Sequence, residues 1–220
     1  MEKVINSKLL SWYRKNKRNL PWRQTQANNL PDPYFVFVSE YMLQQTTVGT
    51  VKNRFEEFIL KWPTINDLAR ISEKTILNFW SGLGYYSRAR YLLKAAKIIK
   101  KEFNSKIPNN YDDLINLPGI GDYTTKAILG IAYNKSVMPL DANIERILAR
   151  LYGLKLPIIK IKNDLRKKSD NFISKNSSSD LIQAFMDFGS LICTPRNPDC
   201  VNCLIQKNCN AFNYNLQDII

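Results

Sequence analysis

The stretch Leu117-Pro-Gly-Ile-Gly-Asp-Tyr-Thr-Thr-Lys-Ala-Ile128 decides the fold. Two glycines bracket one apolar residue between segments of helical pattern, which predicts a tight hairpin that joins two helices. Such a turn directs unpaired backbone N–H groups at one point in solvent, where they can bind a phosphate. Because a backbone phosphate carries no base information, Gly119 and Gly121 are expected to bind nucleic acid without reading its sequence. An ordinary helix-turn-helix corner would explain a bare Gly-x-Gly, but it explains this full string in a basic chain less well.

The composition indicates the kind of partner and excludes some chemistry. The 220 residues include 32 Lys and Arg against 19 Asp and Glu, a formal net charge of +13 that is typical of nucleic-acid-binding proteins. A hydrophobic fraction of 45% excludes a disordered chain and suffices for one large core or two small ones. Histidine is absent, so imidazole catalysis and imidazole metal sites are excluded. Any chemistry must rest on carboxylates, Lys, Tyr, Cys or a cofactor.

The chain is predicted to be all-α. Glycine is scarce, few segments alternate with period two, and apolar residues recur three or four apart. A first helix is expected to begin near Val4 and to end at the basic run Lys15 to Arg18, and a second runs from Asp32-Pro33 to about Thr46. Further helices are expected at about 48–60, 64–70, 73–80, 87–103, 111–116, 123–132 and 142–152, and a Lys/Arg-rich stretch at 155–168 leads into two last helices.

Two carboxylates stand at positions suited to acid–base chemistry. Glu40 lies in an otherwise apolar and amide-bearing stretch, where desolvation should raise its pKa and make it a general acid. Asp141 directly precedes a predicted helix, where an ionised carboxylate can stabilise a positively charged sugar. Each residue also has an ordinary interpretation, Glu40 as a solvated surface residue and Asp141 as a helix cap. Position alone does not decide between them.

The four cysteines, Cys193, Cys200, Cys203 and Cys209, all lie near the C-terminus. A disulfide framework would spread them along the chain, whereas this grouping indicates the ligands of one centre. Four thiolates within one short loop suit a cubane [4Fe–4S] cluster. Structural zinc is the alternative, but its usual layout is two close pairs with a longer spacer. The compact, unequal spacing therefore favours the cluster.

Five motifs follow one another along the chain. They are Ser39-Glu-Tyr-Met-Leu-Gln-Gln-Thr46, Gly82-Leu-Gly-Tyr-Tyr-Ser-Arg-Ala-Arg90, Leu117-Pro-Gly-Ile-Gly121, Leu140-Asp-Ala-Asn143, and the cysteine pattern of Cys193 to Cys209. In this order they resemble the helix-hairpin-helix DNA glycosylases with a C-terminal iron–sulfur loop, and more narrowly the adenine glycosylases of the MutY type. Five ordered motifs make coincidence improbable.

The resemblance extends from Leu9 to about Phe212 and implies a fold. It implies a helix-hairpin-helix glycosylase with a six-helix barrel domain at residues 29–135. An iron–sulfur cluster domain would comprise residues 1–28 and 136–220, with the DNA and active-site cleft between the two domains. Adenine glycosylases of this type usually carry a further C-terminal domain that reads 8-oxoguanine, and that domain lies outside the resemblance.

The resemblance also implies catalytic roles. Glu40 matches the acid that protonates the flipped purine at N7, Asp141 matches the carboxylate that stabilises the oxocarbenium-like sugar, and Asn143 matches a supporting polar residue. Tyr123 stands where the bifunctional endonuclease III branch has a catalytic lysine, so no Schiff base is expected there. Tyr123 could instead hydrogen-bond the two carboxylates and hold them in place.

Further positions match DNA contacts of the family. Leu43, Gln45 and Tyr85 match residues that wedge into the duplex where the base is extruded. Lys126 is expected to contact a phosphate, and Gln183 matches a contact to the adenine edge. With Gly119 and Gly121, these are the expected DNA-binding residues.

The implied protein is a monomeric, monofunctional glycosylase that removes adenine mispaired with 8-oxoguanine or guanine in double-stranded DNA. Thymine glycosylases that act on T·G or U·G mismatches share the architecture and are the alternative. A non-catalytic DNA-binding or redox-sensing iron–sulfur protein, and a lyase-competent endonuclease, are two further alternatives. The sequence has no signal peptide and no membrane span, so a cytoplasmic location is expected, at the nucleoid in a bacterium.

Overall fold

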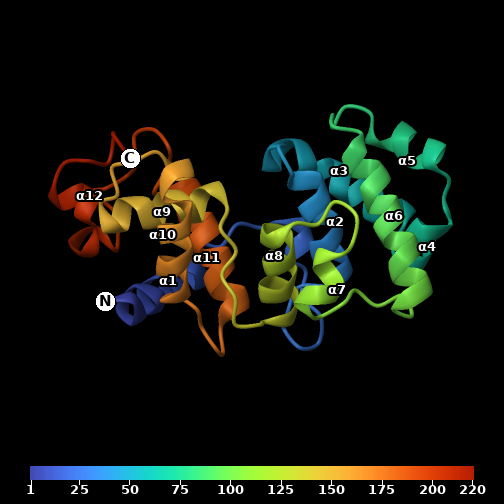
Figure 1. The fold of residues 1–220 in the computed structure, drawn as a ribbon, viewed down its shortest axis with the longest axis horizontal. Helices are drawn as coiled ribbons and strands as arrows, with labels where there is room; N and C mark the ends of the chain where they lie inside the picture. The colour runs from blue at the N-terminus through green and yellow to red at the C-terminus, as the bar shows by residue number, and fades with distance from the viewer. The chain divides into compact units, whose positions relative to one another are not determined.

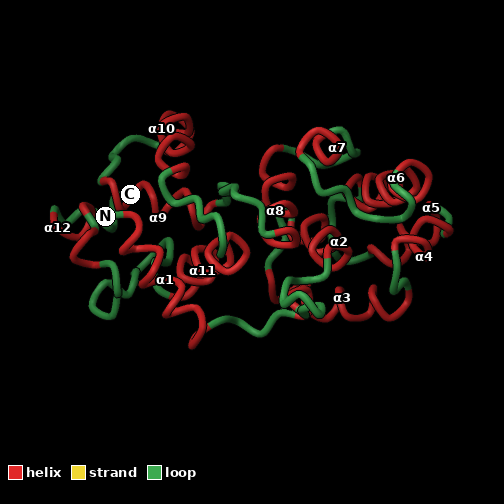
Figure 2. The backbone as a smooth tube through the Cα atoms, turned by 90° about the horizontal axis from the view of Figure 1, so that it is seen from below, coloured by secondary structure: helices red, strands yellow, loops and turns green.

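The computed structural model describes residues 1–220, and it contains helices, loops and a single isolated bridge between Thr25 and Pro31 (Figure 1, Figure 2). The predicted all-α class is confirmed. The chain divides into two compact units. We call residues 19–133 the hairpin unit, and residues 1–18 with 134–220 the cysteine unit.

The hairpin unit is built around one apolar helix. Helix α2 (Pro33–Leu43) begins at Asp32, whose side chain accepts a hydrogen bond from Tyr34 N. Nearly every residue of α2 is buried, as expected for a helix without a polar face. It packs against α3, α6 and α8, and against the short helix η1. The remaining elements are η1 (Pro21–Arg23), α3 (Val48–Lys61), α4 (Ile65–Arg70), α5 (Glu73–Trp80), α6 (Ser87–Glu102), α7 (Tyr111–Ile115) and α8 (Asp122–Tyr133).

The cysteine unit is built around helix α11 (Ser178–Leu191), which packs against α1 (Glu2–Asn16) and α9 (Ala142–Tyr152). Asp187 of α11 is fully buried and accepts hydrogen bonds from the backbone and the side chain of Arg18. A buried carboxylate needs such a partner, so this contact ties the end of the N-terminal segment to α11. The unit also contains α10 (Ile158–Asp170), η2 (Gln206–Asn208) and α12 (Asn210–Asn213).

Two expectations about helices were wrong. The second helix ends at Leu43 and not near Thr46, because Gln45 adopts a left-handed backbone with φ of 55°. The basic stretch at 155–168 does not precede two helices but itself forms most of α10, so that only α11 follows before the cysteines. The apolar residues Ile161 and Leu165 of α10 are buried, which explains why a lysine-rich segment folds as a helix on this unit.

The boundary between the units also lies elsewhere than expected near the N-terminus. Residues 19–28, expected with the cysteine loop, belong to the hairpin unit. The reason is Trp22 of η1, which is buried and packs edge-on against Phe55 of α3, with ring centroids 5.5 Å apart.

No helix of the chain combines the length and the apolar character needed to cross a membrane.

Candidate active site and nucleic-acid interface

Glu40 lies on the central helix of the hairpin unit and is only 7% exposed. Its chain neighbours Ser39 and Tyr41 are more deeply buried still. The ordinary interpretation of Glu40 as a solvated surface residue is therefore wrong. The carboxyl group is thus enclosed by the folded unit and is not presented to bulk solvent.

The hairpin expected between Leu117 and Ile128 is present. Helix α7 ends at Ile115, α8 begins at Asp122, and the turn between them closes with a hydrogen bond from Ile120 N to Leu117 O at 3.2 Å. Both glycines of the turn are exposed to solvent. Two side chains from α2 and its C-terminal end hold the turn: Tyr41 Oη donates to Pro118 O, and Gln44 Nε2 donates to Gly119 O at 3.2 Å. The helix that carries Glu40 thus also positions the hairpin.

The two glycine positions differ in whether they leave room for a side chain. Gly119 has φ of 79°, and a Cβ there would lie 2.8 Å from Tyr91 Cβ and 3.0 Å from Tyr41 Cε1. Gly121 has no atom within 4 Å of the position that a Cβ would take. Only Gly119 is therefore fixed as glycine by both backbone and packing.

We expect Gly119→Ala to lower stability by at least about 1–2 kcal/mol, because a left-handed backbone is costly for alanine and the new methyl group would clash. Duplex affinity should fall with it as the turn deforms. Gly121→Ala is the matched control and should change either quantity little. Thermal unfolding and titration of a fluorescent duplex would measure both; equal effects of the two substitutions would contradict this account.

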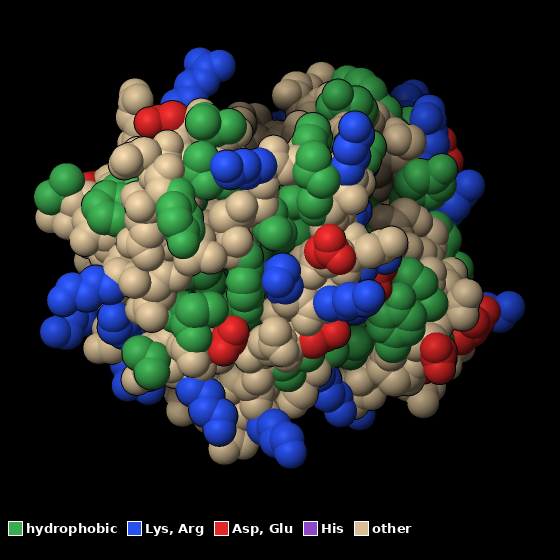
Figure 3. Space-filling model, turned by 60° about the vertical axis from the view of Figure 1, so that its left-hand side comes forward, with side chains coloured by type: hydrophobic (Ala, Val, Ile, Leu, Met, Phe, Trp, Pro, Cys, Tyr) green, Lys and Arg blue, Asp and Glu red, His purple; other side chains and the backbone are tan.

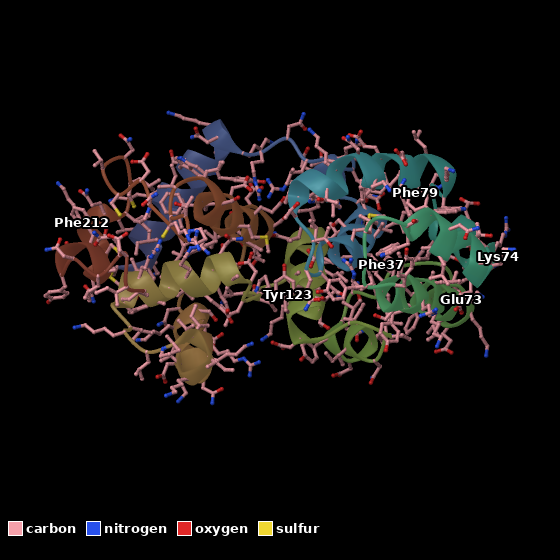
Figure 4. The ribbon with its side chains drawn as sticks, turned by 90° about the horizontal axis from the view of Figure 1, so that it is seen from above. Phe37, Glu73, Lys74, Phe79, Tyr123 and Phe212 are labelled. Carbon is pink, nitrogen blue, oxygen red and sulfur yellow. The ribbon has the colours of Figure 1, made fainter.

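The first five residues of α8 include two of the expected site residues. Tyr123 is half-buried on this helix (Figure 4). Lys126 forms an ion pair with Asp122 at 3.1 Å, and Asp122 also accepts a hydrogen bond from Tyr111 Oη at 2.9 Å. Lys126 is thus held near the hairpin by an acidic partner and is not a free cation. A phosphate contact from Lys126 would have to share or displace this pair.

The three expected wedge residues lie at two places in the hairpin unit: the end of α2 with the loop that follows it, and the loop between α5 and α6. Leu43 is half-buried at the end of α2, and Gln45 follows it in the exposed loop. Tyr85 lies between α5 and α6, is 61% exposed and has φ of 45°. Arg88 of α6, which sequence analysis did not single out, contacts both loops through its buried guanidinium.

Asp141 is the N-cap of α9, as expected. Its Oδ1 accepts a hydrogen bond from Ile144 N at 2.7 Å, and its Oδ2 accepts one from Asn143 Nδ2 at 2.8 Å. Burial raises the pKa of the Asp141 carboxyl, while these hydrogen bonds and the nearby Arg146 guanidinium act in the opposite direction. Asn143 is therefore a direct support for the carboxylate.

Arg146, one turn into α9, connects this support to the cysteine loop. Its guanidinium donates to Asn143 Oδ1 at 2.9 Å, to Cys193 O at 2.8 Å and to Gly189 O at 2.6 Å. Helix α11 comes so close here that a Cβ at Gly189 would lie 2.6 Å from Asn143 Cβ. The residues around Asp141 are thus held from two elements of the same unit.

Gln183 is on α11 and is only 4% exposed. Its Nε2 donates to Ser179 O at 3.1 Å and to Ser179 Oγ at 3.2 Å, while its buried Oε1 has no hydrogen-bond partner. The amide nitrogen therefore fixes the side chain, and the amide oxygen Oε1 remains available to accept a hydrogen bond.

The four cysteines line a single apolar cavity of the cysteine unit. Each is partly buried and none forms a disulfide. Burial, helped by the negative charges of the other cysteine thiolates, raises the pKa of Cys203 to about 12. Thiolates gathered here would repel one another, so the donor set fits a positively charged metal centre. No three of these sulfurs, alone or with acidic side chains, are close enough together to hold a single ion.

A second arginine of α9 anchors the cysteine loop. Arg150 is only 2% exposed, and its Nη1 donates to Thr194 O at 2.6 Å and to Cys193 Sγ at 3.4 Å. Its Nη2 and Nε donate to Pro195 O and Ile220 O. A charge-assisted hydrogen bond to a cysteine sulfur is a contact that tunes iron–sulfur centres.

The expected site residues are thus distributed over both units. The hairpin unit carries Glu40, Tyr123 and the expected wedge residues, and the cysteine unit carries Asp141, Asn143, Gln183 and the cysteines.

Comparison with known proteins assigns the family. Residues 38–170 match the model described as HhH-GPD superfamily base excision DNA repair protein. Adenine DNA glycosylases of Buchnera aphidicola (subsp. Schizaphis graminum, strain Sg) and Mus musculus are 40% and 38% identical to this chain over 95% of it. The matches cover 60% and 42% of those proteins, so the chain spans about three fifths, or less, of the length of these relatives.

Solved structures give the same fold. A thermostable thymine-DNA glycosylase superposes with a TM-score of 0.85 and 28% identity, covering 97% of both chains. A non-covalent endonuclease III–DNA complex superposes with a TM-score of 0.77 at 18% identity, covering 99% of both chains, and supports the fold alone. The helical architecture, the hairpin and the matched family model agree, and the chain belongs to the HhH-GPD superfamily of base excision DNA repair proteins.

Proposed function

We propose that this protein is a monofunctional DNA glycosylase that hydrolyses the N-glycosidic bond of adenine mispaired with 8-oxoguanine or guanine in double-stranded DNA. The observation that carries the proposal is the burial of Glu40, the only charged side chain of the central apolar helix, on the element that also holds the phosphate-binding turn. The identity of about 40% to adenine DNA glycosylases supports adenine as the substrate.

In the proposed reaction, Glu40 donates its proton to N7 of the extruded adenine. The bonding electrons of the N-glycosidic bond then leave with the base, and positive charge develops on the sugar. The Asp141 carboxylate stabilises this cation, with Asn143 and Arg146 holding it in place. Water then adds to the anomeric carbon and gives up a proton to the Glu40 carboxylate, which restores the acid, and an abasic site and free adenine result. Two carboxyl groups in different protonation states are sufficient for this chemistry.

Tyr123 supports the monofunctional assignment. An amine at this position could attack the sugar and form a Schiff base, which would lead to strand cleavage. A phenol does not form that intermediate. We propose that Tyr123 instead hydrogen-bonds the catalytic carboxyl groups, and that the product is an intact strand with an abasic site.

DNA binding is proposed to rest on phosphate contacts and a wedge. The exposed hairpin glycines and the net charge of +13 favour the backbone of the duplex, and Figure 3 shows Lys and Arg side chains spread over the face that it displays. Gln45, Tyr85 and Leu43 would fill the space of the extruded base, and the open Oε1 of Gln183 would accept a hydrogen bond from the adenine edge. We propose that the protein acts as a monomer in the cytoplasm, at the nucleoid in a bacterium.

The four cysteines are proposed to hold a [4Fe–4S] cluster. Their spacing, their shared cavity and the buried Arg150 support it. When bound, such a cluster would supply positive charge and crosslink the C-terminal loop. Hydrolysis of an N-glycosidic bond needs no electron transfer, so its role would be structural or DNA-sensing.

We expect the purified protein to be brown and to contain about four iron atoms and matching acid-labile sulfide per chain. Cys203→Ala should lose the visible absorption and make the segment after Leu191 sensitive to protease, because this loop would lose its crosslink. Metal analysis, visible spectroscopy and limited proteolysis would measure this. A colourless protein with one zinc ion per chain would contradict the cluster.

The experiment that tests the function is single-turnover base release from duplexes that carry A·8-oxoG, A·G, T·G or U·G, each scored with and without alkali. Adenine release with breaks only after alkali is the expected result. The thymine-DNA glycosylase that shares 28% identity over almost the whole chain makes T·G and U·G the necessary comparison. Thymine or uracil release would assign the protein to that branch, and breaks without alkali would contradict the monofunctional assignment.

A further inference from the structure

One buried guanidinium joins the two loops that carry the expected wedge. Arg88 is 5% exposed, and its Nη1 donates to the carbonyls of Tyr41, Met42 and Gln44 at the C-terminal end of α2. Its Nη2 donates to the carbonyls of the loop before α6, Leu83 O at 2.8 Å and Gly84 O at 3.1 Å. Five backbone carbonyls from two segments thus converge on one side chain.

Both loops are strained next to these carbonyls. Gln45 has φ of 55° and Tyr85 has φ of 45°, and each directly follows a residue whose carbonyl accepts from Arg88. Left-handed backbone costs about 1–2 kcal/mol per residue for a side chain other than glycine, so it persists only where surrounding contacts enforce it. The Arg88 guanidinium also lies 5.5 Å from the centre of the Tyr85 ring, a cation–π contact.

Other side chains brace one loop without reaching the other: Gln44 Nε2 ties the first loop to Gly119 O at 3.2 Å, and two further side chains brace the second. Trp80 Nε1 donates to Gly84 O at 3.1 Å, and Arg54 donates to the carbonyls of Phe79 and Ser81. Neither of these two side chains contacts the 44–47 loop through a hydrogen bond. Arg88 is therefore the side chain that couples one loop to the other.

We propose that Arg88 is a positioning residue that sets the Gln45 and Tyr85 loops in one rigid arrangement, so that both side chains enter the duplex together when the adenine is extruded. The inference rests on the proposed function. Extrusion costs a few kcal/mol, and a preformed wedge offsets it without the entropy loss of ordering two loops on the DNA.

Lysine cannot replace Arg88 in this role. A guanidinium presents its donors as a planar fork toward two directions at once, whereas an ammonium is a single point on a flexible stem. Arg88→Lys keeps the charge but can reach only one set of carbonyls. The matched control is Arg90→Lys on the same helix, where Arg90 is exposed and pairs with Glu73 at 2.8 Å.

The test measures extrusion separately from bond cleavage. A duplex carries 2-aminopurine in place of the target adenine, on a 2′-fluorinated sugar that resists cleavage, and its fluorescence rises when the base unstacks. We expect Arg88→Lys to reduce the extruded fraction, and the single-turnover rate on A·G, by about 10- to 10²-fold. Arg90→Lys should leave both quantities close to wild type, and affinity for a matched duplex should change little in either variant.

A double-mutant cycle distinguishes positioning from general damage to the fold. In a Gln45→Ala, Tyr85→Ala background the wedge is already lost, so Arg88→Lys should cause little further loss of extrusion. An equal loss in both backgrounds would overturn the inference. If Arg88→Lys fails to fold, Gly84→Ala takes its place in the same double-mutant cycle. Gly84 has φ of 69° and a Cβ there meets no atom within 4 Å, so this substitution strains the backbone of the Tyr85 loop without a clash. Full extrusion of the base by Gly84→Ala would overturn the inference as well.

The outcomes also separate this inference from the proposed function. If the wild-type protein extrudes no base at any mispair, the function and the inference both fail. If wild type extrudes 2-aminopurine and Arg88→Lys does so equally well, the glycosylase stands and only the role of Arg88 is overturned.

Discussion

Replacing Glu40 by glutamine should slow adenine release by about 10²- to 10⁴-fold, because an amide of the same shape cannot transfer a proton to the leaving base. Glutamine fills the same volume in the buried face of α2, so the fold and the hairpin that this helix supports should persist. Single-turnover base release on A·8-oxoG and A·G duplexes measures the rate. Duplex titration measures binding, which should remain within a few-fold of wild type.

The control for this substitution is Glu56→Gln on α3, since Glu56 is exposed in the same unit. It should release adenine at the wild-type rate. An unchanged rate in Glu40→Gln would favour a non-catalytic DNA-binding protein on this scaffold. Loss of duplex binding or of the thermal transition in that variant would instead assign Glu40 to the fold.

Replacing Asp141 by asparagine should slow base release by about 10²- to 10³-fold, because a neutral amide does not stabilise a positively charged sugar. Asparagine caps helices about as well as aspartate, so the hydrogen bond to Ile144 N and helix α9 should be retained. The substitution therefore removes the charge and keeps the cap. Single-turnover rates and a thermal unfolding curve would show the two effects separately.

The matched control is Asp32→Asn, because Asp32 is the N-cap of α2 and its Oδ1 accepts a hydrogen bond from Tyr34 N at 2.7 Å, the same length as the bond from Ile144 N to Asp141. It should leave the rate unchanged. A rate loss of equal size in both variants, or loss of α9 stability in Asp141→Asn, would mean that Asp141 serves only as a cap.

The pH dependence of the rate should follow the state of Asp141. Burial raises the pKa of this carboxyl above its ordinary value of about 3.9, and only the ionised form stabilises the sugar cation. Activity should therefore be lost as the pH falls through this raised pKa, at a higher pH than an exposed aspartate would give. The acid limb should be absent from the residual activity of Asp141→Asn.

Much of the site follows from local sequence. The Leu-Pro-Gly-Ile-Gly string specifies a turn between helices, and Asp141 caps α9 through hydrogen bonds within three residues. Interactions of this range depend on residues that are adjacent in the chain, so periodicity, caps and glycines suffice to predict them. The cysteine spacing is local in the same sense.

Long-range contacts decided what sequence patterns could not. The amides Gln44 and Gln45 continue a helical pattern, yet α2 ends before them, where the Gln44 carbonyl accepts a hydrogen bond from Arg88, 44 residues away. Lys126 looks like a free phosphate ligand until the fold pairs it with Asp122. Residues 19–28 join the hairpin unit because Trp22 reaches Phe55.

The buried arginines show most clearly what the sequence alone does not reveal. In a chain with 32 basic residues, nothing in the sequence string distinguishes Arg88 or Arg146 from the solvated ones; Arg150 falls among the apolar positions of its helix, which is a weak signal. The sequence by itself determined the helical class, the hairpin, the cap at Asp141 and the grouped cysteines. Only the tertiary structure decided which guanidiniums are buried and which carbonyls they join, because those acceptors come from segments distant in the chain and meet only when it folds.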